Sequence, residues 1–354
     1  MDILYFVIGI ALLIFIHELG HFIAAKLTGV TVEEFGMGLP PRVLTLFTHK
    51  GTIYSLNAIP LGGFVRLRGE LDRDVPGGLY DATPAARIGI MLAGPLVNLV
   101  AAALLYAFSF MQMGQPDLTR VQIFAVSTNS PAALAGLQDG DILRAIDGNP
   151  IASQQDVQQL VKARLEQNIR ITYQRGEQIF ETSLTPRANP PEGEGAMGIV
   201  MTYPTIPLSW VQALPLGVQA IGAQAYQLAT LPVQLIQGQI RAEEARLVGM
   251  KGMYDMYSAV RQAEAQSPVP TGMNVLTLWA MISASLGILN LLPIPALDGG
   301  RILLVLIEVI SRRRLPNHVE QNLVNISFLL LLGLLIYVNA MDFINPADFS
   351  QLLP

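Results

Sequence analysis

The chain has 354 residues, of which 51% are hydrophobic and only 14% charged, and its formal net charge is -5. A soluble domain of this length rarely has so apolar a composition, and so small and dispersed a charge argues against nucleic-acid binding. The chain has no cysteine, which excludes disulfides, cysteine zinc sites and thiol nucleophiles. We therefore expect an integral protein of a lipid bilayer, in which any metal ligand is His, Asp or Glu.

Four segments are long and apolar enough to cross a hydrocarbon core about 30 Å thick. They are Ile3–Leu27, Ile88–Gln112, Val275–Pro293 and Val324–Ala340. Basic residues gather in the connection between the first two segments and, as Arg312–Arg314, between the last two. By the positive-inside rule both connections are cytoplasmic, so both termini and the long segment 114–273 are expected outside.

The first apolar segment contains two histidines four residues apart, His17 and His21, with Glu18 beside the first. At this spacing both imidazoles lie on one face of a helix and can bind a single Zn²⁺, while the glutamate is placed to act as a general base. Ionisable groups in a spanning helix cost about 2.5–3.5 kcal/mol each, so three of them need a partner or a cavity. Two packed histidines beside a buried, protonated Glu18 are the alternative. The pattern favours a zinc hydrolase motif inside a membrane helix.

The connection after this segment has a strand–turn–strand signature, in which Thr52–Ile59 and Phe64–Arg68 flank a turn at Pro60–Gly63. A helical substrate hides its carbonyl groups, and an exposed hairpin edge can hold an unwound segment by strand pairing. An ordinary cytoplasmic hairpin is the alternative. The candidate substrate contacts in this stretch are Ile53, Leu56, Gly62 and Gly63.

The second apolar segment contains the small-residue run Ala93–Asn98, which close helix packing explains well. Asn98 is in addition a candidate for ordering the site or contacting substrate. The external residues from Gln115 to about Arg187 indicate a small domain of short strands, one helix and turns. Its Ser130–Gly148 stretch resembles a PDZ domain, a fold that binds peptide termini by strand addition or restricts access to a protease.

Residues 189–273 indicate a linker followed by amphipathic helices at the membrane interface. Five glutamines fall within an arc of roughly 80° on a helical wheel, namely Gln212, Gln219, Gln227, Gln234 and Gln237. Pro215 and Pro232 are expected to break or kink this helix. No structure is predicted for residues 241–272.

The third apolar segment ends in Asn290-Leu291-Leu292-Pro293-Ile294-Pro295-Ala296-Leu297-Asp298-Gly299-Gly300. The prolines and glycines of this run interrupt the helix. An interrupted backbone is tolerated within a membrane only where it lines protein or water. Asp298 is therefore the natural third zinc ligand, and a cap for a helix beginning near Arg301 is the alternative. His49 and His318 lack ligand spacing and are expected on the surface.

Taken in order, these motifs resemble the site-2 protease family, in particular its bacterial RseP-like intramembrane metalloproteases. The resemblance implies that His17, His21 and Asp298 bind zinc, that Glu18 is the general base, and that Asn290 holds the substrate or the oxyanion. It also implies a membrane-re-entrant β-loop that includes Gly36 and Gly38, which are further candidate substrate contacts. The chain has room for one PDZ domain, whereas some relatives carry two.

The expected fold class is an α-helical polytopic membrane protein with four transmembrane helices, an inserted extracytoplasmic α+β PDZ domain and a membrane-associated β-hairpin. We expect four divisions. Residues 1–113 form the first two helices with the β-loop, and residues 114–188 form the PDZ domain. Residues 189–273 form a linker with interfacial helices, and residues 274–354 form the last two helices.

The expected function is zinc-dependent cleavage of the transmembrane segment of a single-span membrane protein, such as an anti-sigma factor or a signal-peptide remnant. The site is expected in the cytoplasmic half of a bacterial inner membrane, with a peptide or substrate terminus as a candidate partner of the PDZ domain. A membrane zinc carrier or sensor, in which Glu18 is a fourth ligand, and a non-catalytic PDZ adaptor are the alternatives.

Overall fold

The computed structural model describes residues 1–70, 75–240, 246–264, 272–346 and 349. The chain divides into two compact units, which we describe separately. The first joins Met1–Gln112 to Ser209–Pro354, and the second is Met113–Leu208.

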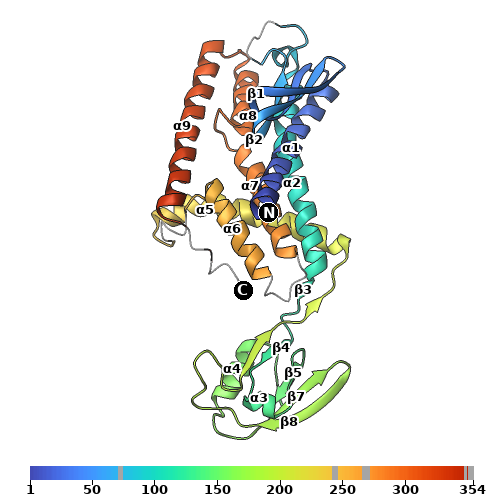
Figure 1. Cartoon of the computed structure of the whole chain (residues 1–354), viewed down its shortest axis with the longest axis vertical. Coiled ribbons are helices and arrows are strands. Elements are labelled where there is room, and N and C mark those ends of the chain that lie inside the picture. Colours follow the sequence, from blue (N-terminus) through green and yellow to red (C-terminus); the bar gives the residue numbers. More distant parts are fainter. Residues whose placement is uncertain (71–74, 241–245, 265–271, 347–348, 350–354) are drawn as a thin grey trace. The chain divides into compact units, whose positions relative to one another are not determined.

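In the described part of the first unit, four helices are long and apolar enough to cross a membrane. They are α1 (Asp2–Thr28), α2 (Pro84–Met113), α7 (Met273–Asn290) and α9 (Asn317–Ile344). Each coincides with one predicted segment, so the structure has a candidate spanning helix at each of the four predicted positions. Their orientation across the membrane stays a prediction. α9 is exposed along most of its apolar length and runs along one side of this unit (Figure 1).

Helix packing in this unit depends on small residues that let neighbours approach. A Cβ atom at Gly9 of α1 would lie 2.3 Å from the Trp279 ring of α7, and one at Gly20 would lie 2.6 Å from the Ala93 carbonyl of α2. Lipid tails are as apolar as leucine, so spanning helices associate through such close van der Waals contact more than through the hydrophobic effect. Glycine at both positions therefore brings α1 against its two neighbours.

A two-stranded sheet follows α1, made of β1 (Val32–His49) and β2 (Thr52–Leu67). Residues 34–37 pair with 53–56 on one side and with 63–66 on the other. The predicted pairing of the two β2 segments with each other is therefore wrong, because β1 lies between them. The predicted turn is a continuation of β2, bent at Gly62, where φ is 112°.

Glu34 holds this sheet together from within. Glu34 is 2% exposed, and its carboxylate accepts hydrogen bonds from Arg42 at 2.8 and 2.6 Å and from Ser55 at 2.7 Å. Burial alone would raise the pKa of Glu34, but these bonds and the charges of Arg42 and Arg66 outweigh it, so the pKa lies below its ordinary value. The ionised carboxylate therefore ties the start of β1 to the middle of the same strand and to two positions of β2.

Helix α7 ends at Asn290, and the chain then turns sharply into α8 (Asp298–Ser311). Cβ atoms at Gly299 and Gly300 would lie 2.1 Å and 2.0 Å from the carbonyl oxygens of Leu291 and Ile294. Only glycine permits this approach. The paired glycines therefore press the Pro-rich turn onto the start of α8 and set the position of Asp298.

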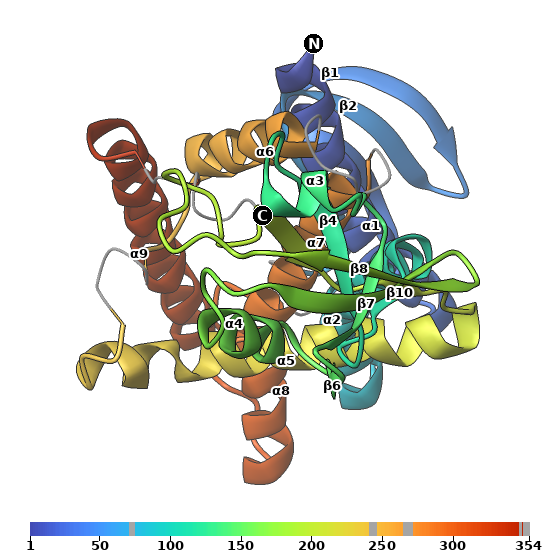
Figure 2. The same cartoon turned by 90° about the horizontal axis from the view of Figure 1, so that it is seen from below.

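Two further helices belong to the first unit. α5 (Trp210–Ile236) crosses α2 and α7 (Figure 2) and packs Ala220 and Ile221 against them. It is one continuous helix, so a break at Pro215 or Pro232 is wrong, while a kink at either proline stays a prediction. The second helix, α6 (Met250–Glu264), lies in a stretch for which no structure was expected. The rest of that stretch, 241–245 and 265–271, lies outside the described residues.

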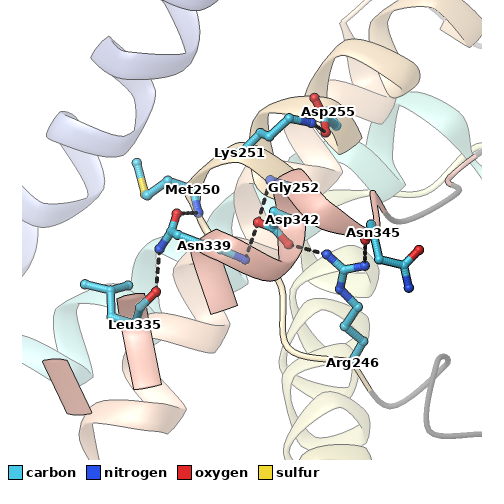
Figure 3. Close-up of polar contacts among 10 residues, drawn as sticks. Arg246, Met250, Lys251, Gly252, Asp255, Leu335, Asn339, Asp342 and Asn345 are labelled. Carbon is cyan, nitrogen blue, oxygen red and sulfur yellow. Dashed lines mark hydrogen bonds and ion pairs between the residues drawn. The ribbon is translucent and has the colours of Figure 1, made fainter. Parts of the chain in front are cut away.

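The last turns of α9 cap the start of α6 (Figure 3). Asp342, which is 1% exposed, accepts hydrogen bonds from the backbone N–H groups of Gly249 and Gly252, both at 2.9 Å, and from Arg246 at 2.6 Å. Asn339 accepts a bond from the Met250 N–H at 3.0 Å. The first N–H groups of a helix have no partner within it, so these side chains stabilise α6 and join it to α9.

The second unit is an α+β domain whose main sheet has the strand order β8-β7-β5-β4-β9, with β6 beside β5. Its elements are β3 (Gln115–Pro116), β4 (Val121–Val126), α3 (Pro131–Leu134), β5 (Ile142–Ile146), β6 (Asn149–Pro150), α4 (Gln154–Lys162), β7 (Ile169–Arg175), β8 (Gln178–Leu184), β9 (Ile199–Thr202) and β10 (Thr205–Ile206). Val121, Ile169 and Ile171 are fully buried in its core. β9 extends the sheet past residue 188, into the expected linker, because its backbone pairs with β4.

We predict that Asp342→Ala destabilises the first unit by about 2 kcal/mol, because it removes the ion pair of the partly buried Arg246 guanidinium and leaves two helix-start N–H groups without their acceptor. Thermal unfolding in detergent measures the effect. Lys251→Ala is the matched control, since the Lys251–Asp255 pair on the same helix is about a third exposed and contributes about 0.5 kcal/mol or less. Equal midpoints for the two variants would contradict this account of the junction.

Candidate metal centre

Three side chains from two helices meet at one point of the first unit. The Nε2 atoms of His17 and His21 lie 3.2 Å apart, and they lie 3.2 Å and 3.4 Å from the Oδ2 atom of Asp298. Among the described residues, these three potential metal ligands form a cluster whose ligand atoms all lie within 4.8 Å of one another. The structure therefore brings together the three residues expected to bind metal.

Each histidine ring is held by a group from α2. The Nδ1 atom of His21 lies 2.7 Å from the carbonyl oxygen of Ile90, and that of His17 lies 3.4 Å from the amide nitrogen of Asn98. A Cβ atom at Gly94 would lie 2.3 Å from the Nε2 atom of His21, so the glycine makes the space that the ring occupies. Both Nε2 atoms are thereby directed toward Asp298.

Asp298 reaches the histidines from the first turn of α8. The residue before it, Leu297, is the N-cap, and the cap has no side-chain hydrogen bond. The alternative assignment of Asp298 as a cap is therefore wrong, because its carboxylate faces the two imidazoles. Two imidazole nitrogens and a carboxylate oxygen are ligands that zinc prefers, and three protein ligands leave a position open for water or substrate. The donor set fits Zn²⁺.

A polar cavity of about 240 Å³ lies beside the cluster, and Glu18 and Asn290 are among its lining residues. The Asn290 amide donates a hydrogen bond to the Leu286 carbonyl at 3.0 Å. A second cavity of about 330 Å³ also reaches Glu18 and is lined by four glycines and by Leu56 from the β1–β2 sheet. These glycines are Gly36, Gly38, Gly62 and Gly63. Glu18 thus lies between the metal cluster and the sheet.

Two predicted contacts lie elsewhere. Ile53 pairs with Glu34 and Thr48 inside the sheet and lines neither of these cavities. Asn98 is buried against His17 and lines neither cavity, so it touches a candidate ligand and not the space for substrate. His49 and His318 are exposed, as expected.

Sequence reasoning missed Arg301 and Glu70, which line the same cavity as the cluster. The Arg301 guanidinium donates a hydrogen bond to Glu70 at 2.7 Å. The spacing of three residues between Asp298 and Arg301 was the available signal, because it places both on one face of α8. Glu70 offered no such signal, since its partner is distant in the sequence.

The chain is similar to a family model and to several known proteins. The family model described as “Peptidase family M50” matches residues 5–334. A “putative zinc metalloprotease” of Clostridium perfringens is 31% identical over 352 residues, covering 98% of this chain and 99% of the relative. A relative from Campylobacter jejuni with the same descriptive name is 33% identical, covering 95% of this chain and 91% of the relative. The solved PDZ domain of an SdrC-like protein from Listeria monocytogenes is 26% identical, with 23% of this chain and 85% of that chain covered and a TM-score of 0.21.

We predict that Gly94→Ala lowers zinc affinity by at least about tenfold, because the added methyl group displaces the ring of His21. Zinc competition with a chromophoric chelator on the purified protein measures this. Gly89→Ala, on the same helix, is the control, since its Cβ would meet nothing within 4 Å. A Gly94→Ala protein that binds zinc as tightly as the Gly89→Ala protein would refute the placement of His21.

Proposed function

The chain belongs to peptidase family M50, the site-2 protease family, and from this premise we propose that it is a zinc-dependent intramembrane endopeptidase that cleaves single-span membrane proteins. The observation that carries the proposal is the His17–His21–Asp298 cluster on helices of an apolar bundle, with Glu18 beside it. The cluster is polar and lines a cavity within an apolar helical bundle. Ionisable groups in such surroundings cost free energy, so their presence indicates a function.

Zinc, when bound, would lower the pKa of water toward about 7 and polarise the scissile carbonyl. Glu18 takes the proton of the attacking water and later gives it to the leaving amine. Asn290 has a second amide N–H besides the one bonded to Leu286, and this donor is available to the oxyanion.

Strand addition to β2 is our proposed mode of substrate presentation. Within the described sheet, residues 63–66 pair with β1 on one side only, which leaves their other edge for a substrate. Phe64 and Val65, on this edge, line the cavity that contains Glu18. A substrate segment unwound against this edge therefore presents its carbonyl groups to the general base. Gly36, Gly38, Leu56, Gly62 and Gly63 line the adjoining space for its side chains.

We assign the second unit the role of a PDZ domain that binds a peptide or substrate terminus. A groove of about 410 Å³ lies between α4 and β9, and Val161, Leu165 and Met201 give it apolar walls. β9 ends the strand order of the main sheet, so its outer edge can take an added strand. Apolar walls beside a strand edge suit an extended peptide with apolar side chains.

The proposed location is the bacterial cytoplasmic membrane, with the termini and the PDZ domain outside and the metal centre toward the cytoplasmic side. The distribution of basic residues supports this orientation. The proposed reaction is site-2 cleavage in regulated intramembrane proteolysis, on substrates such as anti-sigma factors or signal-peptide remnants.

One observation favours a protease over a zinc carrier or sensor. Glu18 lies in the wall of two cavities and is not part of the cluster of ligand atoms. A carrier that used Glu18 as a fourth ligand would place its carboxylate among those atoms. A non-catalytic adaptor would have no need of three ligands and a base at one cavity.

We predict that Glu18→Gln abolishes cleavage of a single-span reporter, with a loss of at least about 10²-fold, and leaves zinc content unchanged. Cleavage in reconstituted vesicles and metal analysis of the same preparation measure the two effects. Loss of zinc together with cleavage would support the carrier instead, and equal behaviour of both proteins would support the adaptor.

For the groove, we predict that Leu165→Glu weakens binding of a peptide with an apolar C-terminus by about tenfold or more, because it places a charge in an apolar wall. Fluorescence anisotropy with the full-length protein measures the affinity. Ile179→Glu is the control, since Ile179 is 67% exposed on β8, at the opposite edge of the sheet. Equal affinities for the two variants would exclude this groove as the peptide site.

A further inference from the structure

An ion pair joins the helix that carries one candidate metal ligand to the end of the strand that we assign to the substrate. Arg301 lies in α8 one turn after Asp298, so the two side chains share one face of that helix. Glu70 comes shortly after β2, which ends at Leu67. The Arg301 guanidinium donates a hydrogen bond to the Glu70 carboxylate at 2.7 Å. One contact thus connects the metal centre with the substrate strand.

Backbone hydrogen bonds hold Glu70 close to β2. The Glu70 N–H donates to the Leu67 carbonyl at 3.3 Å, and the Arg68 N–H donates to the Thr31 carbonyl at 2.9 Å. The Arg68 carbonyl in turn accepts from the Leu79 N–H at 2.8 Å. Because these bonds form one compact turn at the end of the strand, the position of Glu70 and the position of the strand end depend on each other.

The substrate edge of β2 has a second support beside the general base. A Cβ atom at Gly63 would lie 3.3 Å from the Cγ atom of Glu18, so the Gly63 backbone lies against that side chain. The next residue, Phe64, lines the same cavity as the ion pair. The strand is therefore supported at Glu18 and again at Arg301. A strand held at one point can turn about that point, whereas two supports fix its direction.

Apolar packing also brings the strand end and α8 together, because Leu67 and Ile302 belong to one hydrophobic cluster. Apolar burial is non-directional, so it joins the two elements without fixing how they lie along one another. The ion pair connects two specific atoms, Nη1 of Arg301 and Oε1 of Glu70, and supplies that direction. Their side chains are 35% and 28% exposed, so the pair contributes little to folding stability. Its effect is on alignment.

We propose that Arg301 and Glu70 are positioning residues that fix the substrate strand relative to the metal centre and so select the peptide bond that is cut. This inference rests on the proposed function, in which a substrate segment adds to residues 63–66 of β2. Side chains of a strand alternate between two faces, so pairing registers that keep the same faces differ by two residues. A fixed edge presents one substrate carbonyl to the metal, while an edge that shifts also presents its neighbours.

Cleavage of a single-span reporter in reconstituted vesicles tests the proposal, with the ends of the products identified by mass spectrometry. We expect the wild type to cut one bond and Glu70→Ala to cut also the bonds two residues away. We expect kcat of Glu70→Ala to fall by about tenfold or more while KM changes by less than about threefold, because a small misplacement of reacting groups costs rate more than binding. Its zinc content should be unchanged, since Glu70 is not a candidate ligand.

Asp255→Ala is the matched control. The Lys251–Asp255 pair is about as exposed as the Arg301–Glu70 pair, at 29% and 31%, and lines neither cavity of the site. This variant should cut the wild-type bond at the wild-type rate.

Two further variants separate alignment by the pair from a direct action of its cation. Arg301→Lys keeps a cation within reach of Glu70 and should cut the wild-type bond, because the observed contact uses one guanidinium nitrogen. Combining Glu70→Ala with Arg301→Ala should have no more effect than either change alone, since all three proteins lose the same interaction.

The pairing register is also measurable without catalysis. The chain has no cysteine, so Phe64→Cys in the Glu18→Gln protein provides a single thiol at the substrate edge. Disulfide formation with a series of reporters, each carrying one cysteine, shows which substrate residue lies opposite that thiol. We expect one favoured position when Glu70 is present, and additional positions two residues away after Glu70→Ala.

A Glu70→Ala protein that cuts only the wild-type bond, at the wild-type rate, would overturn the positioning role, and so would an unchanged crosslinking pattern. A loss of activity in Arg301→Ala that Glu70→Ala does not share would overturn it as well, because Arg301 would then act in the cavity on its own. A wild type that binds zinc but neither cleaves nor crosslinks the reporter would refute the proposed function, and this inference with it.

Discussion

Polar groups inside an apolar helical bundle must find their partners within the protein, and this constraint organises the whole first unit. His17, His21 and Asp298 satisfy one another and are backed by Ile90 and Asn98. Farther along the helices, Arg87 of α2 and Glu308 of α8 form an ion pair at 2.7 Å, with both side chains 7% exposed. Buried pairs of this kind tie helices in one register, because separating them would leave a charge without a partner.

Close approach of backbones is the second requirement, and it follows from the first. Side chains as short as histidine and aspartate meet only if their helices nearly touch, so glycine lies at each point of contact. Gly20 and Gly94 bring α1 and α2 together, and Gly299 and Gly300 press the turn after α7 against α8. The geometry of the candidate metal centre thus depends on these glycines as much as on the three candidate ligands.

Much of this architecture follows from local patterns along the chain. Apolar runs mark the four long helices because a bilayer demands about 20 apolar residues in a row, and the four-residue spacing of the histidines follows from the helical period. The errors lie where non-local pairing decides. The β2 segments pair with β1 instead of each other, β9 joins a sheet through its bonds to β4, and α5 continues through Pro215 and Pro232.

The sequence by itself determined the apolar helices, the pair His17 and His21 with Glu18 beside them, and Asp298 as the natural third ligand, because chemistry and short spacing specify them. Only the tertiary structure decided that Asp298 reaches the histidines, that Glu18 lines two cavities, and that Asn98 faces His17 and lines neither cavity. These contacts join residues far apart in the chain. Their distances depend on how closely the helices pack, which no pattern within a single helix expresses.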